Sequence, residues 1–440
     1  MTVIISGAGI GGLTLALSCH QANIPFLIFE KAPELQPLGV GINVQPHAVR
    51  ELFELGLEDD LDEIGVRTRE LVYFSKTGKK IWDEPRGVYA GYKWPQYSLH
   101  RGELQMLLYR RLLELGHQVH LNTTVTKIVS MSDTGVTVEA VSPEGTRIVS
   151  GHVLIAADGI HSVLRKRLAP HEGDPVWNGA VLWRGTSLAR TFLGGDTIAY
   201  AGHASQKFVT YPIAPANADG LVLINWIAEL NVGVEDRRRG TAYNQEADFA
   251  DFFPKFEQWN FDWLDIPDLM LQRQQCYEYP MVDRDPLECW TDGLMTLLGD
   301  AAHPMYPIGS NGASQAILDA RVLVREFLKH GVTRDALLAY EAERRPATNR
   351  LVLANRGNGP DQVMQIVEER CAGVFENISE VLTRQELEEI AEQYKKFAGM
   401  QVQELNHRPS IITEEILERS AFVHAERQKE AEQLEEGLSP

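Results

Sequence analysis

The feature that most constrains the fold is a Gly-x-Gly-x-x-Gly pattern between a short apolar run and a stretch with helical spacing. The glycines are Gly7, Gly9 and Gly12; Val3 to Ile5 precede them and Leu13 to Ala22 follow. In a strand, turn and helix unit, the first glycine allows the turn, the second lets the backbone approach a pyrophosphate, and the third permits close packing. The helix start also favours an anion. The pattern predicts a Rossmann-like domain that binds an adenine dinucleotide.

A second apolar run, Pro25 to Phe29, is followed by Glu30 and Lys31. An acid at the end of the second strand can accept hydrogen bonds from ribose hydroxyls, and it repels a 2'-phosphate. We therefore expect Glu30 and its neighbour Lys31 to lie at the adenosine end of the cofactor.

Composition and charge narrow the class of protein. The 440 residues are 44% hydrophobic and 23% charged, which suits a globular chain of two or three units. The net charge of -19 argues against nucleic acid or an anionic membrane as the main partner. Because the chain has neither a signal sequence nor a long apolar run, we expect a cytoplasmic protein without stable membrane association. A monomer and a homodimer are both compatible with the sequence. The cysteines show no C-x-x-C or metal-ligand spacing, so we expect reduced thiols and no metal site.

Two further motifs follow in the sequence. Residues 153–165 read as a buried strand, a turn at Asp158 and Gly159, and a helix start that contains Arg165. Residues 299–313 run Gly-Asp-Ala-Ala-His-Pro-Met-Tyr-Pro-Ile-Gly-Ser-Asn-Gly-Ala. Combined with the glycine turn, the later run points to FAD rather than to a nicotinamide held alone. Over residues 1–400 the three motifs, in this order, resemble the FAD-dependent aromatic hydroxylases of the p-hydroxybenzoate hydroxylase type. Residues 299–316, with 355–360, look like the phenazine hydroxylase branch.

The resemblance implies roles around the flavin. Asp300 would hold the ribityl hydroxyls, and Pro304 would lie near the flavin ring. Gly309, Gly312 and Ala313 would start a helix aimed at the flavin N1 and C2 carbonyl. Backbone donors at a helix start suit that position, because reduced flavin carries negative charge near N1.

The resemblance also implies contacts along the rest of the cofactor. An arginine in this position lies near the pyrophosphate and ribityl chain, a glycine-rich loop lies along the flavin, and an Asp-Gly motif serves both FAD and NAD(P)H. The matching residues here are Arg101, then Gly41 and Gln45, then Asp158, Gly159 and Arg165. Other readings stay open: a surface salt bridge for the first arginine, and for the others hydrogen bonds that only satisfy or brace their own loops.

His303 invites assignment as a catalytic base, but no partner with suitable spacing lies near it in the sequence. We interpret it as a structural or flavin-contact residue. Because the chain has a single Gly-x-Gly-x-x-Gly, NADH or NADPH would bind only briefly to reduce FAD.

Aromatic-rich strands between 179 and 276 suggest a floor for a flat apolar ligand. The candidate substrate residues are Trp183, Arg184, Tyr211 and Asn225. Arg184 could pair with a substrate carboxylate or point outward. Each of these side chains could equally belong to a plain sheet core.

The predicted fold class is α/β: a Rossmann-like FAD-binding domain, an inserted mixed β-sheet substrate domain and a C-terminal helical region. Hairpins are expected around residues 76–78 and 143–145. The FAD-binding domain would take residues 1–75, 98–178 and 277–350, the substrate domain 76–97 and 179–276, and the helical region 351–440. The charged segment 413–436 would be a solvated face or an oligomer contact.

The resemblance implies a single-component FAD monooxygenase that uses NAD(P)H and O2. Oxygen would pass from a flavin C4a-hydroperoxide to an electron-rich aromatic or N-heteroaromatic ring, such as a phenazine-like carboxylate. The protein would position the ring and exclude water, with Pro304 and Gly309 in the flavin environment and no protein nucleophile. The alternatives are an oxidase or reductase without oxygen insertion, a non-catalytic FAD-binding protein, and a halogenase. The last requires a Trp-x-Trp-x-Ile-Pro segment that the chain lacks.

Overall fold

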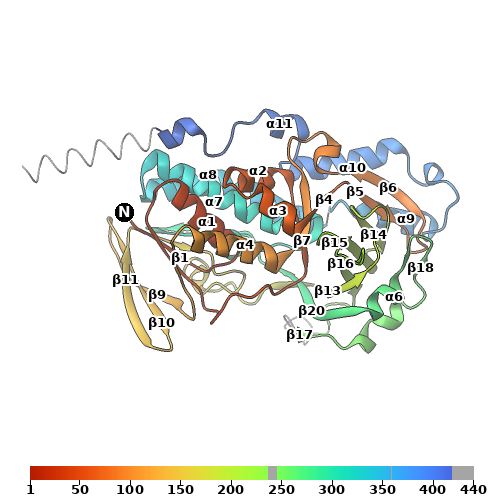
Figure 1. Cartoon of the computed structure of the whole chain (residues 1–440), viewed down its shortest axis with the longest axis horizontal. Helices are drawn as coiled ribbons and strands as arrows, with labels where there is room; N and C mark the ends of the chain where they lie inside the picture. The colour runs from red at the N-terminus through yellow and green to blue at the C-terminus, as the bar shows by residue number, and fades with distance from the viewer. Residues whose placement is uncertain (236–244, 358, 419–440) are drawn as a thin grey trace, which may run out of the picture.

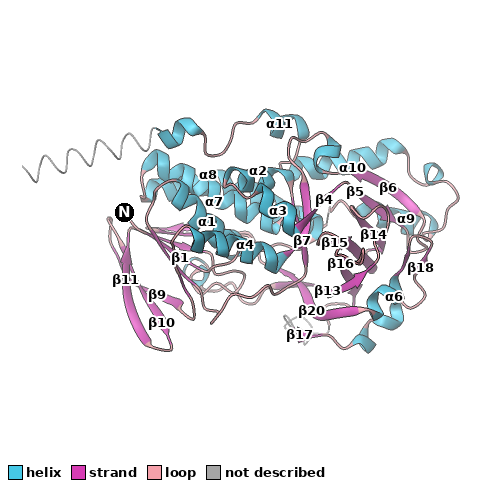
Figure 2. Ribbon diagram, viewed as in Figure 1, coloured by secondary structure: helices cyan, strands magenta, loops and turns pink. Residues whose placement is uncertain are grey.

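The computed structural model describes residues 1–235, 245–357 and 359–418. Figure 1 shows a helix-covered sheet at the left and centre and a second, larger sheet at the right. Figure 2 shows that helices gather over the first sheet and along the upper edge of the second. In the described part of the chain, no helix combines the length and apolar character needed to cross a membrane.

The first sheet has six strands in the order β21-β22-β12-β1-β2-β8. Its central strand β1 is buried at all four residues and pairs in parallel with β2 and β12 on its two sides. A parallel strand buried on both faces needs such a continuous apolar run. The strands are β1 (Val3–Ser6), β2 (Phe26–Phe29), β8 (Val119–His120), β12 (Val153–Ala156), β21 (Thr291–Asp292) and β22 (Met295–Leu297).

Helices cover this sheet and bring the chain back between its strands. Helix α1 packs against both α4 and α7, and α7 packs against α8 and α2. The helices are α1 (Ile10–Gln21), α2 (Pro46–Glu54), α3 (Glu58–Ile64), α4 (Arg101–Glu114), α5 (Arg165–Leu168), α7 (Gly312–His330) and α8 (Arg334–Asn355). The predicted strand, turn and helix unit at the N-terminus is therefore confirmed.

The second sheet, called the large sheet below, has eight strands in the order β17-β20-β13-β16-β15-β14-β5-β6. One face is covered by an aromatic cluster that includes residues of the segment 247–270. The other face packs against Tyr306 and the C-terminal helices. Its strands are β5 (Glu70–Phe74), β6 (Lys80–Pro85), β13 (Val176–Ala189), β14 (Thr197–His203), β15 (Gln206–Pro212), β16 (Val222–Asn231), β17 (Gln245–Glu246) and β20 (Arg273–Asp283).

The remaining strands of the described residues form three smaller sheets. A sheet in the order β3-β7-β4 joins the two main sheets, a sheet β11-β10-β9 projects from the first, and β18 pairs with β19. The strands are β3 (Gly41–Val44), β4 (Gly65–Thr68), β7 (Gln96–His100), β9 (Thr124–Met131), β10 (Val136–Ser142), β11 (Gly145–Gly151), β18 (Asn260–Phe261) and β19 (Leu264–Asp265). The short helices η1 (Gly87–Ala90), η3 (Phe249–Asp251), η4 (Phe253–Lys255), η5 (Gly299–Ala301), η6 (Ile308–Ser310), η7 (Ile378–Glu380) and α6 (Ile266–Leu271) lie in connections.

The C-terminal region is helical, as predicted, and it lies on the large sheet. It contains α9 (Gln362–Cys371), α10 (Arg384–Phe397) and α11 (Val402–His407). Val363, Met364 and Val367 of α9 and Leu387 of α10 are buried in the cluster on the sheet face. Of the charged segment 413–436, only residues up to 418 lie within the described part of the chain.

Both predicted hairpins form, as β5 with β6 and β10 with β11. The boundary predicted after residue 75 is wrong in one respect. Strand β5 pairs in parallel with β14, with Glu70 opposite Thr197, so it belongs to the large sheet. At the other end, β20 continues this sheet to Asp283 rather than ending at 276.

Candidate active site

The glycine turn lies at the carboxyl end of β1, where α1 begins. Gly7 has φ +109°, and a Cβ on it would lie 2.3 Å from the Ala157 carbonyl oxygen. A Cβ on Gly12 would lie 2.0 Å from the Gly7 carbonyl oxygen. On Gly9, by contrast, it would meet no described atom within 4 Å. Gly7 and Gly12 are therefore required by packing, whereas Gly9 borders open space at the anion-favouring end of α1.

Glu30 follows β2 beside this turn. Its carboxylate accepts hydrogen bonds from the backbone N–H of Ala8 at 2.8 Å and of Ala32 at 2.9 Å. Gln105, from α4, donates to the Ala8 carbonyl oxygen at 2.8 Å. Lys31 is exposed. The predicted acid thus lies beside the glycine turn, at the edge where parallel sheets bind dinucleotides.

Arg101 is the first residue of α4 and its side chain is exposed. Within the described residues, its guanidinium has no hydrogen-bond or ion-pair partner in the protein. It lies near two other predicted cofactor elements: a Cβ on Gly39 would be 3.7 Å from its Cβ, and its charge lowers the pKa of Asp300. The structure therefore does not show the surface salt bridge that was the alternative for this residue.

Helix α1 packs against α4, which carries Arg101, and against α7, which follows Asp300. Asp300 has a pKa raised by desolvation, an effect that the charges of His303 and Arg101 oppose. Gly312, the first residue of α7, borders space in which an added Cβ would meet no described atom within 4 Å. Gly11 of α1 lies against Leu298 and Ala316, which brings the two helix starts together. Ala313 is partly buried beside Gly312.

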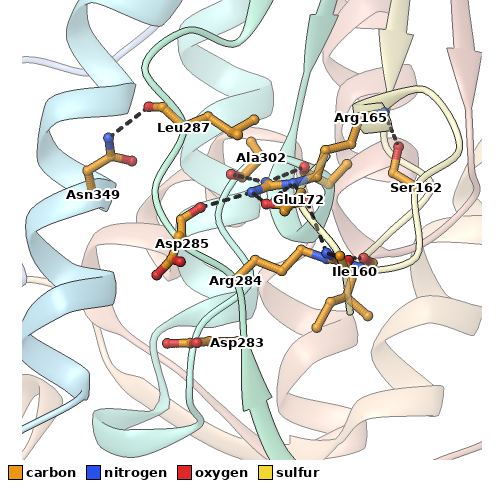
Figure 3. A network of polar contacts seen from close by, with 12 residues as sticks. Ile160, Ser162, Arg165, Glu172, Asp283, Arg284, Asp285, Leu287, Ala302 and Asn349 are labelled. Carbon is orange, nitrogen blue, oxygen red and sulfur yellow. Dashed lines mark hydrogen bonds and ion pairs between the residues drawn. The ribbon is translucent and has the colours of Figure 1, made fainter. Parts of the chain in front are cut away.

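Arg165 corrects one prediction. Its side chain is 1% exposed, and all its donors are used inside the protein (Figure 3). They bind Glu172, the carbonyl oxygens of Ala301 and Ala302 at 3.0 and 2.8 Å, and that of Asp285 at 3.0 Å. No N–H of this guanidinium is left for a cofactor. Arg165 instead fixes the backbone that follows Asp300.

Asp158 also braces its own turn. Its Oδ2 accepts a hydrogen bond from the Val163 N–H at 3.1 Å. Desolvation raises its pKa, and hydrogen bonds from Ser162 and backbone N–H groups oppose that shift. Its Oδ1 is buried and has no hydrogen-bond partner among the described residues. Gly159 has φ +79°, the left-handed region that this turn requires.

His303 is held by an ion pair that the sequence did not suggest. Its Nε2 lies 2.5 Å from Asp319 Oδ2 of α7, and the other carboxylate oxygen of Asp319 accepts from Arg344 Nε at 2.7 Å. Burial opposes ionisation of Asp319, but the charges of His303 and Arg344 lower its pKa to about 2. Asp319 also accepts from the Gly299 N–H at 3.1 Å. This geometry agrees with the structural interpretation of His303, while its buried Nδ1 has no hydrogen-bond partner among the described residues.

The loop from Gly39 to His47 is attached to the large sheet. The Gly41 N–H donates to Asn225 Oδ1 at 2.8 Å, and Arg184 Nη2 donates to the Gly41 carbonyl oxygen at 2.8 Å. A Cβ on Gly41 would lie 2.7 Å from Asn225. Gln45 is 4% exposed and donates weakly to the Gly309 carbonyl oxygen at 3.4 Å. Arg184 and Asn225 therefore position the loop.

Trp183 does not belong with the other predicted substrate residues. It lies on the opposite face of the large sheet, stacked on Phe252 with ring centroids 4.9 Å apart, and its Nε1 donates to Glu278. Tyr211 lies on the face of Arg184; burial raises the pKa of Tyr211, and the charge of Arg184 opposes that shift. Neighbouring strand residues point to opposite faces, so Trp183 and Arg184 cannot line one pocket.

A small cavity lies between the Gly39–His47 loop, the 309–310 turn, the large sheet and the C-terminal region. Most of its lining was not predicted. The lining residues are Asn43, Gln45, Leu71, Arg86, Gln96, Ile198, Tyr200, Gly309, Ser310, Pro360, Tyr394 and Met400. They come from eight separate stretches of the chain. Asn43 and Gln45 lie in the glycine-rich loop, and Gly309, Ser310 and Pro360 lie in the runs 299–316 and 355–360, but only Gln45 and Gly309 were predicted as site residues. Leu71 and Tyr200 could have been found from strand alternation once β5 was paired with β14.

The turn before α7 places its two prolines differently. Pro304 is buried, whereas Pro307 is exposed. The place of Pro304 near the flavin ring stays a prediction. Gly309 has φ +70°, and a Cβ there would lie 1.8 Å from the Tyr394 hydroxyl oxygen. Tyr394 thus fixes the turn from the C-terminal helices.

Comparison with known proteins agrees with this geometry. The FAD binding domain family matches residues 1–355, and the chain belongs to that family. Phenazine 1,6-dicarboxylic acid hydroxylase of Lysobacter antibioticus is 44% identical over 361 residues, which are 80% of this chain and 89% of the relative. 3-Hydroxybenzoate 6-hydroxylase 1 of Aquipseudomonas alcaligenes is 30% identical over 366 residues, 80% and 87% of the two chains.

The fold is shared with solved structures. Klebsiella pneumoniae HpxO, crystallised with FAD and uric acid, superposes with a TM-score of 0.69 at 24% identity, over 91% of this chain and 95% of that one. The chain is an FAD-dependent monooxygenase of the aromatic hydroxylase class, and NAD(P)H is the reductant of that class. Its substrates are a small aromatic molecule and O2.

The residues present fit FAD. Open space lies over Gly9 and Gly312, the Arg101 guanidinium has no described protein partner, and Asp300 is exposed close to it. A helix start, a cation and a carboxylate are the groups that a pyrophosphate and a polyhydroxylated chain need. When bound, FAD supplies the redox chemistry that activates O2.

Proposed function

We propose that this protein hydroxylates a planar aromatic carboxylic acid, of the phenazine carboxylate or hydroxybenzoate kind. The observation that carries the proposal is the 44% identity, over 80% of this chain, to a hydroxylase named for a phenazine dicarboxylic acid. The 3-hydroxybenzoate hydroxylase, a second relative, also acts on an aromatic acid by its name. The cavity offers side chains of a suitable kind, because Leu71, Ile198 and Met400 are apolar and Arg86 is cationic.

In this proposal, the FAD pyrophosphate lies at the start of α1, over Gly9, and Arg101 binds it. Glu30 binds the adenosine ribose, and Asp300 binds the ribityl chain. The start of α7, at Gly312 and Ala313, faces the flavin ring. Gly7, Gly12, Gly159 and Arg165 support these positions through the backbone contacts described above.

The chain's own contribution to the reaction is to place the substrate ring and to exclude water. The large sheet provides one wall of the cavity, and the C-terminal residues Pro360, Tyr394 and Met400 provide another. Correct placement of reacting groups is worth roughly 7 to 11 kcal/mol in well-oriented systems. The C-terminal helices are therefore part of the substrate site in this proposal.

The free thiols of all four cysteines, which the structure describes, support the expected cytoplasmic location.

The test is NAD(P)H consumption by the FAD-loaded protein with a panel of phenazine carboxylates and hydroxybenzoates, followed by mass spectrometry of the products. We expect an acid that accelerates NAD(P)H use and gains one oxygen atom. NADH and NADPH are compared in the same assay. Stoichiometric H2O2 with every acid, and no oxygenated product, would favour an oxidase and contradict the proposal.

A further inference from the structure

Arg86 places a positive charge at the wall of the cavity. It follows β6 directly and precedes η1, and its side chain is 14% exposed. Among the described residues that line the cavity, it is the one with a permanent charge. Its Nε is buried and has no hydrogen-bond partner in the described part of the chain. A buried cationic donor without a partner is costly, so an acceptor at this position would be stabilising.

Arg86 has an ion-pair partner in Glu84, but that pair does not satisfy the donors of its guanidinium. Glu84 Oε1 lies 3.6 Å from Arg86 Nη2, which is an ion pair but not a hydrogen bond. The other oxygen of Glu84 lies 3.8 Å from Lys395 Nζ of α10, but Lys395 pairs more closely with Glu392 Oε1, at 2.9 Å. Asp361 is the next acid in this region, and it is paired with Lys207 at 2.6 Å. With Glu392 counted, the charges of this cluster balance, but Glu84 lies too far from Arg86 for a hydrogen bond, and the buried Nε donor of Arg86 stays unused.

Two tyrosines, one of which lines the cavity, lie within the electrostatic reach of Arg86. Tyr200 lines the cavity and packs edge to face on Tyr73, with ring centroids 5.7 Å apart. Tyr73 is fully buried, and its hydroxyl has no hydrogen-bond partner among the described residues. Arg86 acts electrostatically on both tyrosines. A cation with an unused donor and the Tyr200 ring thus belong to the same cavity wall as the apolar side chains of Leu71, Ile198 and Met400.

We propose that Arg86 binds the carboxylate of the aromatic substrate and selects acids over neutral analogues. The inference rests on the proposed function, and it moves the carboxylate role from Arg184 to Arg86. Arg184 also has a buried Nε without a partner among the described residues, but it does not line the cavity, and its Nη2 holds the Gly41 carbonyl oxygen of the loop. The planar guanidinium of Arg86 suits a carboxylate, because its donors match the two oxygens.

The test compares acids with their uncharged amides on the FAD-loaded protein. Three pairs are titrated by flavin absorbance change and by calorimetry: phenazine-1-carboxylate, 3-hydroxybenzoate and benzoate, each with its carboxamide. We expect the native protein to bind at least one acid on the order of 10- to 100-fold more tightly than its amide. In Arg86→Gln the ratio should fall to about 1, while the amide affinity changes less than about threefold. Arg69→Gln, an exposed arginine next to β5, should retain the native ratio.

The outcomes separate the two proposals. If no acid binds to the native protein, the proposed substrate class fails and the role of Arg86 fails with it. If acids bind and are hydroxylated but Arg86→Gln keeps the native acid-to-amide ratio, the Arg86 assignment alone is overturned. Should Arg86→Gln lose FAD, Arg86→Lys is tested instead. Lysine keeps the positive charge but cannot donate two parallel hydrogen bonds to a carboxylate. An acid-to-amide affinity ratio lowered roughly tenfold would support the assignment, and an unchanged ratio would contradict it.

Discussion

The Tyr394 hydroxyl of α10 accepts a hydrogen bond from Asn311 Nδ2 at 2.9 Å, and so joins the C-terminal helices to the residue that precedes α7. The same hydroxyl lies 3.2 Å from the Ile308 carbonyl oxygen and 3.3 Å from Asn355 Oδ1. The turn at Gly309 therefore has its position set by a residue about 80 positions later in the chain. The family match ends at residue 355, but Pro360, Tyr394 and Met400 also line the cavity.

Removal of this hydroxyl should loosen the turn. For Tyr394→Phe we expect a loss of about 1 to 3 kcal/mol in the free energy of unfolding. The reason is that the buried hydroxyl contacts Asn311, Ile308 and Asn355 at once, and all three contacts are lost. FAD affinity should fall several-fold. Urea unfolding and the fluorescence of released FAD measure the two effects. Tyr89→Phe, at a tyrosine that is 56% exposed, is the matched control. Unchanged FAD affinity in Tyr394→Phe would show that the turn keeps its shape without the hydroxyl.

The second and third glycines of the pattern, Gly9 and Gly12, allow a paired experiment. In Gly9→Ala the methyl group enters open space, so the apoprotein should keep its stability while FAD binds roughly tenfold more weakly, about 1.4 kcal/mol. In Gly12→Ala the methyl group meets the Gly7 carbonyl oxygen, so the apoprotein itself should lose about 1 to 3 kcal/mol. Unfolding curves without FAD and equilibrium titration with FAD distinguish the variants. Equal losses of apoprotein stability would contradict the assignment of Gly9 to the cofactor.

Local sequence patterns predicted the FAD-binding half well, because each motif there is a contiguous strand, turn and helix. Gly7, Gly12 and Glu30 lie where their spacing placed them, since a glycine turn between β1 and α1 leaves little choice of geometry. The hairpin of β5 and β6 was equally local. Its membership of the large sheet was not, because the parallel pairing of β5 with β14 spans more than 120 residues.

The substrate side was harder to predict because it is assembled from distant segments. Arg86 and Tyr394 carry no motif, and only the folded chain brings them to one cavity. The error at Trp183 was avoidable, since alternation along β13 places it on the opposite face from Arg184. Arg165 could not be assigned from sequence, because an arginine that binds phosphate and one that binds backbone carbonyls look alike there.

The position of Arg165 predicts a structural defect rather than a specific loss of cofactor contact. Arg165→Met removes the donors to Ala301 and Ala302 and leaves Glu172 with Arg284 alone. We expect a loss of about 3 to 5 kcal/mol in the free energy of unfolding of the apoprotein. Arg167→Met, whose arginine is 48% exposed and paired with Asp292, should cost less than about 1 kcal/mol. A stable Arg165→Met apoprotein that fails only to bind FAD would restore the cofactor role.

His47 predicts how stability depends on pH. It is buried, and desolvation, with the charges of Arg344 and Arg408, lowers its pKa from 6.5 to about 3. Below pH 6.5 the unfolded chain takes up a proton at His47 that the folded chain does not, so this residue makes stability fall as the pH falls. The slope from one such group is about 1.4 kcal/mol per pH unit, and it should persist until the folded pKa is approached. Urea unfolding at saturating FAD, from pH 7.5 to 5, measures it.

His47→Gln should reduce the slope of stability against pH by the contribution of one proton, whereas His171→Gln, at an exposed histidine, should leave the slope unchanged. Parallel stability profiles for the native protein and His47→Gln would show that His47 is protonated in the folded state as readily as in the unfolded chain.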